Sequence, residues 1–286
     1  MNGIRVYLSV DMEGVAGVVS WHQTGKEGAG DYDKARKLMT AEVNAAVEGI
    51  LQAVGDGLPC EVIVNDAHGR MTNLLADELH PKSLLLTGAP KLLSMMHGID
   101  SSFWGAVFVG YHSMLRSSGV LAHSYFPGVV EMKLNGLPIG EFALNAYTAG
   151  YFGVPVVAVT GDDVVAQEAS TLIPNIEAIQ VKWAAGRMAA ICLPPQEARR
   201  RIAQGVQKAV LRQLRESTVK PLSPPSHSTF ELTFANPAMA DGASLLPGAQ
   251  RLDPLTVAYR SNDYLKAVRA ARVMMALASS MPADPY

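Results

Sequence analysis

Residues 4–14 of this 286-residue chain are Ile-Arg-Val-Tyr-Leu-Ser-Val-Asp-Met-Glu-Gly, an apolar and β-branched run that stops at two acids and a glycine. This composition is typical of a strand buried inside a parallel sheet. Further short apolar runs follow along the chain, and each stops at turn-forming residues. We therefore predict buried strands at residues 4–10, 61–64, 84–86, 106–109 and 155–159.

An amphipathic helix is predicted between the first two strands. Its apolar side chains recur every three or four positions, and its charged side chains lie on the opposite side. Gly55 and Gly57 end this helix. The order strand, helix, strand implies right-handed crossovers in an open sheet. The sequence therefore predicts an α/β fold with a mostly parallel open sheet flanked by helices.

Outside these strands the chain has a different pattern. Asn135-Gly136 is a strong two-residue turn signal and predicts a hairpin over residues 129–140. We expect an α/β domain in residues 1–190 and a smaller C-terminal α+β domain in residues 191–286. The other predicted elements are helices at 141–151, after Pro195 and at 262–281, and strands at 229–234 and 255–260.

The composition excludes several classes of protein. Hydrophobic residues make up 49% of the chain and charged residues 17%, which excludes a disordered protein. The net charge of −2 is too close to neutral for a nucleic-acid or anionic-membrane partner. We find no signal-peptide pattern, no membrane-spanning run, and only two cysteines, Cys60 and Cys192. A cytoplasmic location is expected.

Acids and histidines follow three of the predicted strands. Asp11 and Glu13 follow the first strand and, two positions apart, point to the same side. His68 follows the second strand and His112 the fourth. In open α/β sheets the carboxyl ends of the strands form the ligand-binding edge. Each residue alone has a structural alternative, as a capping acid or a hydrogen-bonded histidine, but three convergent strand ends favour a metal site.

A fifth candidate donor, Glu141, opens the helix predicted at 141–151, where a first-turn acid also interacts well with the helix dipole. The five donors are carboxylates and imidazoles without sulfur, a mixture that suits Zn²⁺, with Mn²⁺ or Co²⁺ as substitutes. Five donors exceed the three usual for one catalytic zinc and suit two ions per subunit, which activate water for hydrolysis. The predicted metal ligands are Asp11, Glu13, His68, His112 and Glu141.

Four more residues are candidates for supporting roles. His123 is interpreted as an unligated histidine that moves a proton or stabilises an oxyanion. Asp66 is a candidate to orient a ligand histidine. Asp162 and Asp163 follow the fifth strand and are candidates to bind a substrate ammonium group, with capping of the next helix as the alternative.

At these residues the sequence resembles the bacterial zinc D-aminopeptidases associated with dipeptide-transport operons. The resemblance implies two zinc ions held by the five donors above with Asp11 as the bridge, His123 as the catalytic histidine, and a ring-shaped homodecamer. The motifs that carry it are Ser9–Gly14, Val64–His68, Gly110-Tyr111-His112, His123-Ser124, Gly140-Glu141, Leu144–Tyr147, Ala149–Tyr151, Gly161–Asp163 and Lys220-Pro221-Leu222.

The implied activity is that of a dinuclear zinc aminopeptidase. It releases N-terminal amino acids, D-residues by the resemblance, from short peptides or amides by attack of a metal-bound hydroxide. One alternative is a two-metal phosphoesterase, although no Arg or Lys clamp for phosphate stands beside the predicted strand ends. The other alternative is a non-catalytic protein that binds peptide or metal.

Overall fold

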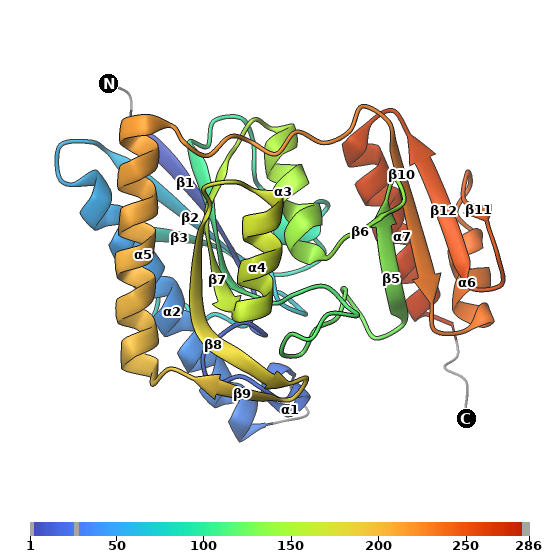
Figure 1. The fold of residues 1–286 in the computed structure, drawn as a ribbon, viewed down its shortest axis with the longest axis horizontal. Helices are drawn as coiled ribbons and strands as arrows, with labels where there is room; N and C mark the ends of the chain where they lie inside the picture. Colours follow the sequence, from blue (N-terminus) through green and yellow to red (C-terminus); the bar gives the residue numbers. More distant parts are fainter. Residues whose placement is uncertain (1–2, 26–28, 282–286) are drawn as a thin grey trace.

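The computed structural model describes residues 3–25 and 29–281, which form two sheets with helices packed on them (Figure 1). The larger sheet has seven strands in the order β3-β2-β1-β4-β7-β8-β9. All neighbours in it are parallel except β8 and β9. Its strands are β1 (Ile4–Val10), β2 (Cys60–Asp66), β3 (Ser83–Leu86), β4 (Gly105–Tyr111), β7 (Val156–Asp162), β8 (Glu177–Gly186) and β9 (Ala189–Cys192).

The predicted α/β fold class is confirmed, and all five predicted strands are present. From β1 the chain moves outward through β2 to β3 and then returns to place β4 on the other side of β1. The strand order therefore reverses between β1 and β4. In open α/β sheets such a reversal opens a crevice at the carboxyl ends of the two strands, where ligands bind.

Helices cover both faces of this sheet, because right-handed crossovers that run in opposite directions from the switch point lie on opposite faces. On one face α2 (Gly30–Val54) packs against α5 (Pro195–Glu216). The crossovers from β4 to β7 and from β7 to β8 contain α3 (Glu141–Tyr151) and α4 (Asp163–Leu172), which contact each other (Figure 1). Two short elements near the crevice are α1 (Trp21–Thr24) and η2 (Ser94–Met96).

The second sheet has five strands in the order β11-β12-β10-β5-β6, all antiparallel, and lies beside the first (Figure 1). In β10 buried and half-buried residues alternate, as in a sheet that is packed on one face only. Two helices contact it and enclose a second core. The elements are β5 (Val129–Leu134), β6 (Leu137–Pro138), β10 (Ser228–Phe234), β11 (Gln250–Arg251), β12 (Thr256–Ser261), α6 (Pro237–Ser244) and α7 (Tyr264–Ser279).

The two cores draw on the chain in an interleaved way. The predicted hairpin, β5 and β6, pairs with β10 of the second sheet although it precedes residue 190. Conversely, α5 follows residue 190 and buries Ile202 and Val206 in the first core. The domain boundary at residue 190 stays a prediction. The division between the two cores does not fall at that position in the chain. Among the described residues, the helices are too short or too polar to cross a membrane.

Candidate metal centre

The sheet register brings the predicted metal ligands to one edge. Val10, the last residue of β1, is opposite Asp66 of β2 and Val109 of β4. The chain continues this pairing beyond the strand, because Asp11 N donates to Val109 O at 2.8 Å. The residues after β1, β2 and β4 therefore leave the sheet together.

Two glycines allow the ends of β1 and β4 to approach closely. Gly14 N donates to Gly110 O at 2.7 Å. A Cβ on Gly14 would collide with the Tyr111 carbonyl, and a Cβ on Gly110 would collide with the Asp11 carbonyl. Gly110 also has a φ of +70°, which favours glycine. These contacts bring Asp11 and His112 into the same crevice.

Asp11 stands between two imidazoles. Its Oδ1 lies 3.0 Å from Nδ1 of His68, and its Oδ2 lies 3.5 Å from Nε2 of His112. Glu13 Oε2 lies 3.0 Å from Nδ1 of His68, and Glu141 Oε1 lies 3.3 Å from Nε2 of His112. The structure therefore brings all five predicted donors together, as two groups that share Asp11.

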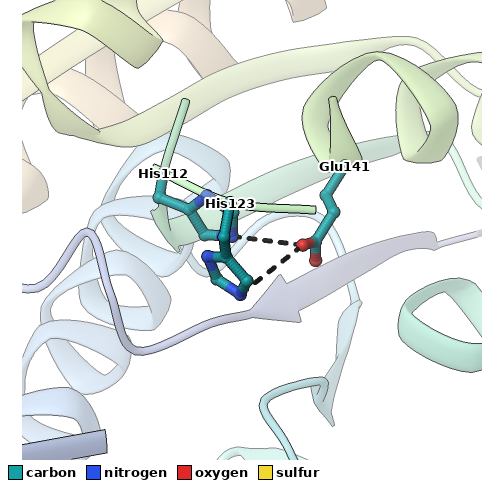
Figure 2. A group of neighbouring side chains, drawn as sticks. All are labelled: His112, His123 and Glu141. Atoms are coloured by element: carbon teal, nitrogen blue, oxygen red, sulfur yellow. Dashed lines mark ion pairs between the residues drawn. The ribbon is translucent and has the colours of Figure 1, made fainter. Parts of the chain in front are cut away.

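His123 lies beside the second group. Figure 2 shows His112 and His123 pointing toward the carboxylate of Glu141, which comes from the start of α3. Nε2 of His123 lies 3.9 Å from Glu141 Oε1, and the rings of His123 and His112 stack with their centroids 4.1 Å apart. Trp21 packs edge-on against His123, and the centroids of the two rings lie 5.2 Å apart.

Each histidine turns one ring nitrogen away from the cluster, where a main-chain carbonyl accepts its proton. The pairs are His68 Nε2 with Thr24 O at 2.7 Å, His112 Nδ1 with Ser113 O at 2.9 Å, and His123 Nδ1 with Leu121 O at 2.9 Å. A carbonyl only accepts, so it fixes a ring proton on that nitrogen, and the other nitrogen of each ring faces the cluster, where it can bind a metal ion once it is deprotonated. Metal-binding histidines are held in this way.

The donor atoms fit a bound cation. All five donor residues are between 1% and 8% exposed, and among the described residues Glu13 Oε2 and His112 Nε2 have no hydrogen-bond partner. Unpaired polar atoms at such depth are costly unless an ion or water satisfies them. Carboxylate oxygens and imidazole nitrogens are donors that Zn²⁺ binds.

Two effects determine the pKa values of the cluster, the burial of each group and the charges of its neighbours. Burial raises the pKa of Asp11, and the charge of Glu13 adds to it, so that the pKa reaches about 7. Burial acts to lower the pKa of His112, but the charges of Glu141 and Asp11 outweigh it and raise that pKa to about 10. The buried acids therefore need positive charge nearby, which protons supply here and divalent cations supply in a metal centre.

The other predicted residues lie outside this cluster. Asp66 accepts from the backbone of Asn73 and Leu74 and contacts no histidine ring among the described residues, so the ring partner of His68 is Thr24 instead. Asp162 caps α4 by accepting from Val165 N at 2.8 Å, which supports the capping alternative.

Asp163 accepts from Ala184 N at 2.8 Å, in the hairpin of β8 and β9. In the part of the chain that the structure describes, neither Asp162 nor Asp163 lines the pocket at the metal cluster. Their predicted contact with a substrate ammonium group gains no geometric support.

A pocket of ≈ 280 Å³ opens onto four of the predicted donors, Asp11, Glu13, His68 and Glu141. Its other lining residues come from the elements of both sheets. The sequence did not reveal them, because aromatic residues, methionine and arginine are common in helices and loops that have no functional role. They include Trp21, Met71, Met95, Tyr125, Phe126, Pro127 and Arg272.

Comparison with known proteins agrees with this architecture. The family described as D-aminopeptidase matches residues 4–273. A D-aminopeptidase from Bacillus subtilis (strain 168) is 40% identical over 278 residues, which cover 96% of this chain and 98% of that protein. A solved structure, the Zn-dependent D-aminopeptidase DppA from Bacillus subtilis, a self-compartmentalizing protease, superposes with a TM-score of 0.92 at 38% identity. The match covers 98% of this chain and 100% of that one.

The resemblance stated from the sequence motifs is thereby confirmed. It spans nearly the whole chain, both sheets included, and does not depend on the metal ligands alone. The chain belongs to the D-aminopeptidase family.

Proposed function

We propose that this protein is a zinc-dependent aminopeptidase that removes D-amino acids from the N-terminus of short peptides or amides. The observation that carries the proposal is the meeting of five buried donors at the switch point of the sheet, with Asp11 between two imidazoles. Membership of the D-aminopeptidase family and the zinc dependence of the matched structure supply the reaction and the metal.

Two zinc ions per subunit would be held by Asp11, Glu13, His68, His112 and Glu141, with Asp11 shared between them. Mn²⁺ and Co²⁺ are the expected substitutes, since they accept the same oxygen and nitrogen donors. Bound zinc polarises a carbonyl oxygen and lowers the pKa of water near a scissile bond. Thr24 and Ser113 hold the ligand imidazoles by their main-chain carbonyls.

His123 is proposed as the residue that moves the proton. Burial and the neighbouring His112 lower its pKa, so the ring is neutral near pH 7. Its Nδ1 is committed to Leu121 O, which leaves Nε2 as a proton acceptor facing the pocket. A neutral imidazole in this position takes a proton from the attacking water and returns it to the leaving amine.

The two alternatives considered from the sequence are not favoured. A phosphoesterase needs cationic side chains around its phosphate, and the pocket lining holds one arginine and no lysine among the described residues. A purely binding protein does not explain membership of a peptidase family.

Assembly and location belong to the same proposal. A ring-shaped homodecamer is supported by the self-compartmentalizing nature of the matched protease. A cytoplasmic location agrees with the free state of Cys60 and Cys192.

The test uses the purified protein loaded with zinc. D-Ala-D-Ala and D-Ala-p-nitroanilide are compared with their L-isomers and with p-nitrophenyl phosphate, and metal content is measured by elemental analysis. We expect about two zinc ions per subunit and cleavage of the D-substrates that chelator abolishes. Turnover of the phosphate ester alone, or peptide cleavage that survives complete metal removal, contradicts the proposal.

A further inference from the structure

Arg272 brings a positive charge from the second layer of the molecule to the metal centre. It lies on α7, which packs on the antiparallel sheet, and its side chain lines the same pocket as Asp11, Glu13 and Glu141. Arg272 is the only lysine or arginine in this lining among the described residues. The proposed reaction has given this residue no role.

The guanidinium of Arg272 has no acidic partner within ion-pair distance in residues 3–25 and 29–281. The guanidinium contacts Met275 Sδ, 3.7 Å from Nη1, and the ring of Tyr125, whose centroid lies 4.1 Å from Cζ. Arg251, in the same layer, shows the contrast, because it pairs with Asp241 at 2.9 Å. A half-buried arginine without a carboxylate partner in the protein is available to bind the carboxylate of a ligand.

Tyr125 fixes the guanidinium close to the metal ligands. Its main-chain N–H donates to Glu141 Oε1 at 2.6 Å, while its ring supports Arg272 from one face. One residue therefore joins a predicted zinc ligand to the arginine. Tyr125 also has a φ of +60°, a backbone conformation that costs energy in a tyrosine and that clusters at functional sites.

The remaining lining is mostly apolar and suits a small ligand. Met71, Met95, Phe126 and Pro127 lie in the walls, and the acids belong to the metal cluster. The volume of ≈ 280 Å³ lies at the lower limit of small-molecule sites, which begin at about 300 Å³. A ligand with a reacting carbonyl, a short apolar body and a carboxylate matches these features in kind and in size.

We propose that Arg272 binds the C-terminal carboxylate of the substrate, so that the protein is selective for dipeptides with a free carboxylate. This inference rests on the proposed aminopeptidase function and specifies its substrate class. The carboxylate accepts two parallel hydrogen bonds from the guanidinium, a geometry that lysine does not reproduce. The residue that leaves as the second product then lies between the metal centre and Arg272.

The experiment compares three substrates that differ at their C-terminal end: D-Ala-D-Ala, D-Ala-D-Ala-amide and D-Ala-p-nitroanilide. The variants are Arg272→Gln, Arg272→Lys and, as a matched control on the exposed side of the same helix, Arg269→Gln. Zinc content and thermal unfolding are measured for each variant, so that loss of metal or fold is detected separately.

We expect the unmodified protein to prefer the free acid over the amide. Arg272→Gln lowers kcat/KM for D-Ala-D-Ala by about 10- to 100-fold, mainly through KM, because a charged hydrogen bond is lost. For the amide and the anilide the change stays within about threefold, since neither makes that bond. For D-Ala-D-Ala, the kcat/KM of Arg272→Lys lies between those of Arg272→Gln and the unmodified protein, and the kcat/KM of Arg269→Gln equals that of the unmodified protein.

A second readout does not depend on turnover. Calorimetry measures binding of a D-Ala-D-Ala isostere with a phosphinate in place of the scissile amide, and of its C-terminal amide, to the zinc-loaded protein. Arg272→Gln weakens binding of the acid by a similar factor and leaves the amide unchanged.

Equal losses on acid and amide, or no preference for the acid in the unmodified protein, overturn the role of Arg272 while the aminopeptidase survives. Absence of cleavage on all three substrates in the unmodified, zinc-loaded protein overturns the proposed function, and the inference falls with it.

Discussion

Nζ of Lys182 donates a hydrogen bond to the main-chain carbonyl of Glu13 and so joins β8 to a predicted metal ligand 169 residues away. The same amine donates to Val15 O at 3.1 Å and Val18 O at 2.6 Å, and the side chain has no exposed surface. Glu42 of α2 holds the same loop by accepting from Ala16 N at 2.9 Å. The loop that carries Glu13 is therefore positioned by two buried ionisable residues that lie far apart along the chain.

Lys182→Met removes three donors from this loop and leaves its carbonyls unpaired. We expect the free energy of unfolding to fall by at least about 2 kcal/mol and zinc affinity to fall by about 10- to 100-fold. Urea denaturation and competition with a chromophoric chelator measure the two effects. Lys208→Met, which removes an exposed partner of Glu177, is the control. Unchanged zinc affinity in the Lys182 variant limits the residue to a structural role.

His123 and His112 are stacked but differ in their expected roles. His123→Ala lowers kcat by about 10²- to 10⁴-fold with two zinc ions retained, because only the proton acceptor is lost. His112→Ala loses zinc as well, since its unpaired Nε2 is the expected donor. Elemental analysis beside a D-peptide assay separates the two. The exposed His22→Ala is the control, and loss of zinc from the His123 variant identifies His123 as a ligand.

Gly110 is a position where the backbone requires glycine. Gly110→Ala places a Cβ against the Asp11 carbonyl at a φ of +70°. We expect a loss of at least about 2 kcal/mol in stability together with weaker zinc binding, because the ends of β1 and β4 must separate. Gly57→Ala, which meets open space, provides the comparison. Denaturation curves that match for the two variants contradict this interpretation of the crevice.

Glu42 predicts a pH-dependent contribution to stability. Burial raises its pKa from 4.5 to about 7, against the opposing effects of the Ala16 N–H, Lys182 and Arg199. The folded protein therefore holds a proton on Glu42 that the unfolded chain releases between pH 4.5 and about 7. The stabilisation is complete below pH 4.5 and is lost as the pH rises through about 7.

The measurement is the difference in free energy of unfolding between the unmodified protein and Glu42→Gln, both stripped of zinc, at pH 4.5 and pH 8. We expect this difference to change by about 3 kcal/mol in favour of the unmodified protein at the lower pH. Glu48→Gln, on the exposed side of α2, serves as the control. A difference that does not vary with pH shows that the Glu42 proton is not linked to folding.

Local patterns in the chain were sufficient for most of the fold. Apolar runs predicted five strands of the larger sheet, Asn135-Gly136 predicted the turn between β5 and β6, and the helix expected at 141–151 is α3. The hairpin of β8 and β9 was not predicted. Charged and aromatic residues interrupt its apolar pattern, and its burial depends on α4 and α5, which pack against it.

Four of the five predicted donors could be grouped from the sequence because parallel strands end at one edge of a sheet, so residues at successive strand ends meet whatever their separation along the chain. The fifth, Glu141, opens α3 and was added as a first-turn acid. Asp66 was predicted to orient a ligand histidine, and its carboxylate accepts from Asn73 and Leu74, since loop geometry and not sequence spacing determines which groups it reaches. The same limit applies to Lys182 and Arg272, an ordinary strand lysine and an ordinary helix arginine by any local pattern. Their contacts arise only from the packing of β8 under the Glu13 loop and of α7 beside the crevice. Such packing depends on the whole chain and leaves no periodic signal in either segment, so the sequence of each segment cannot reveal it.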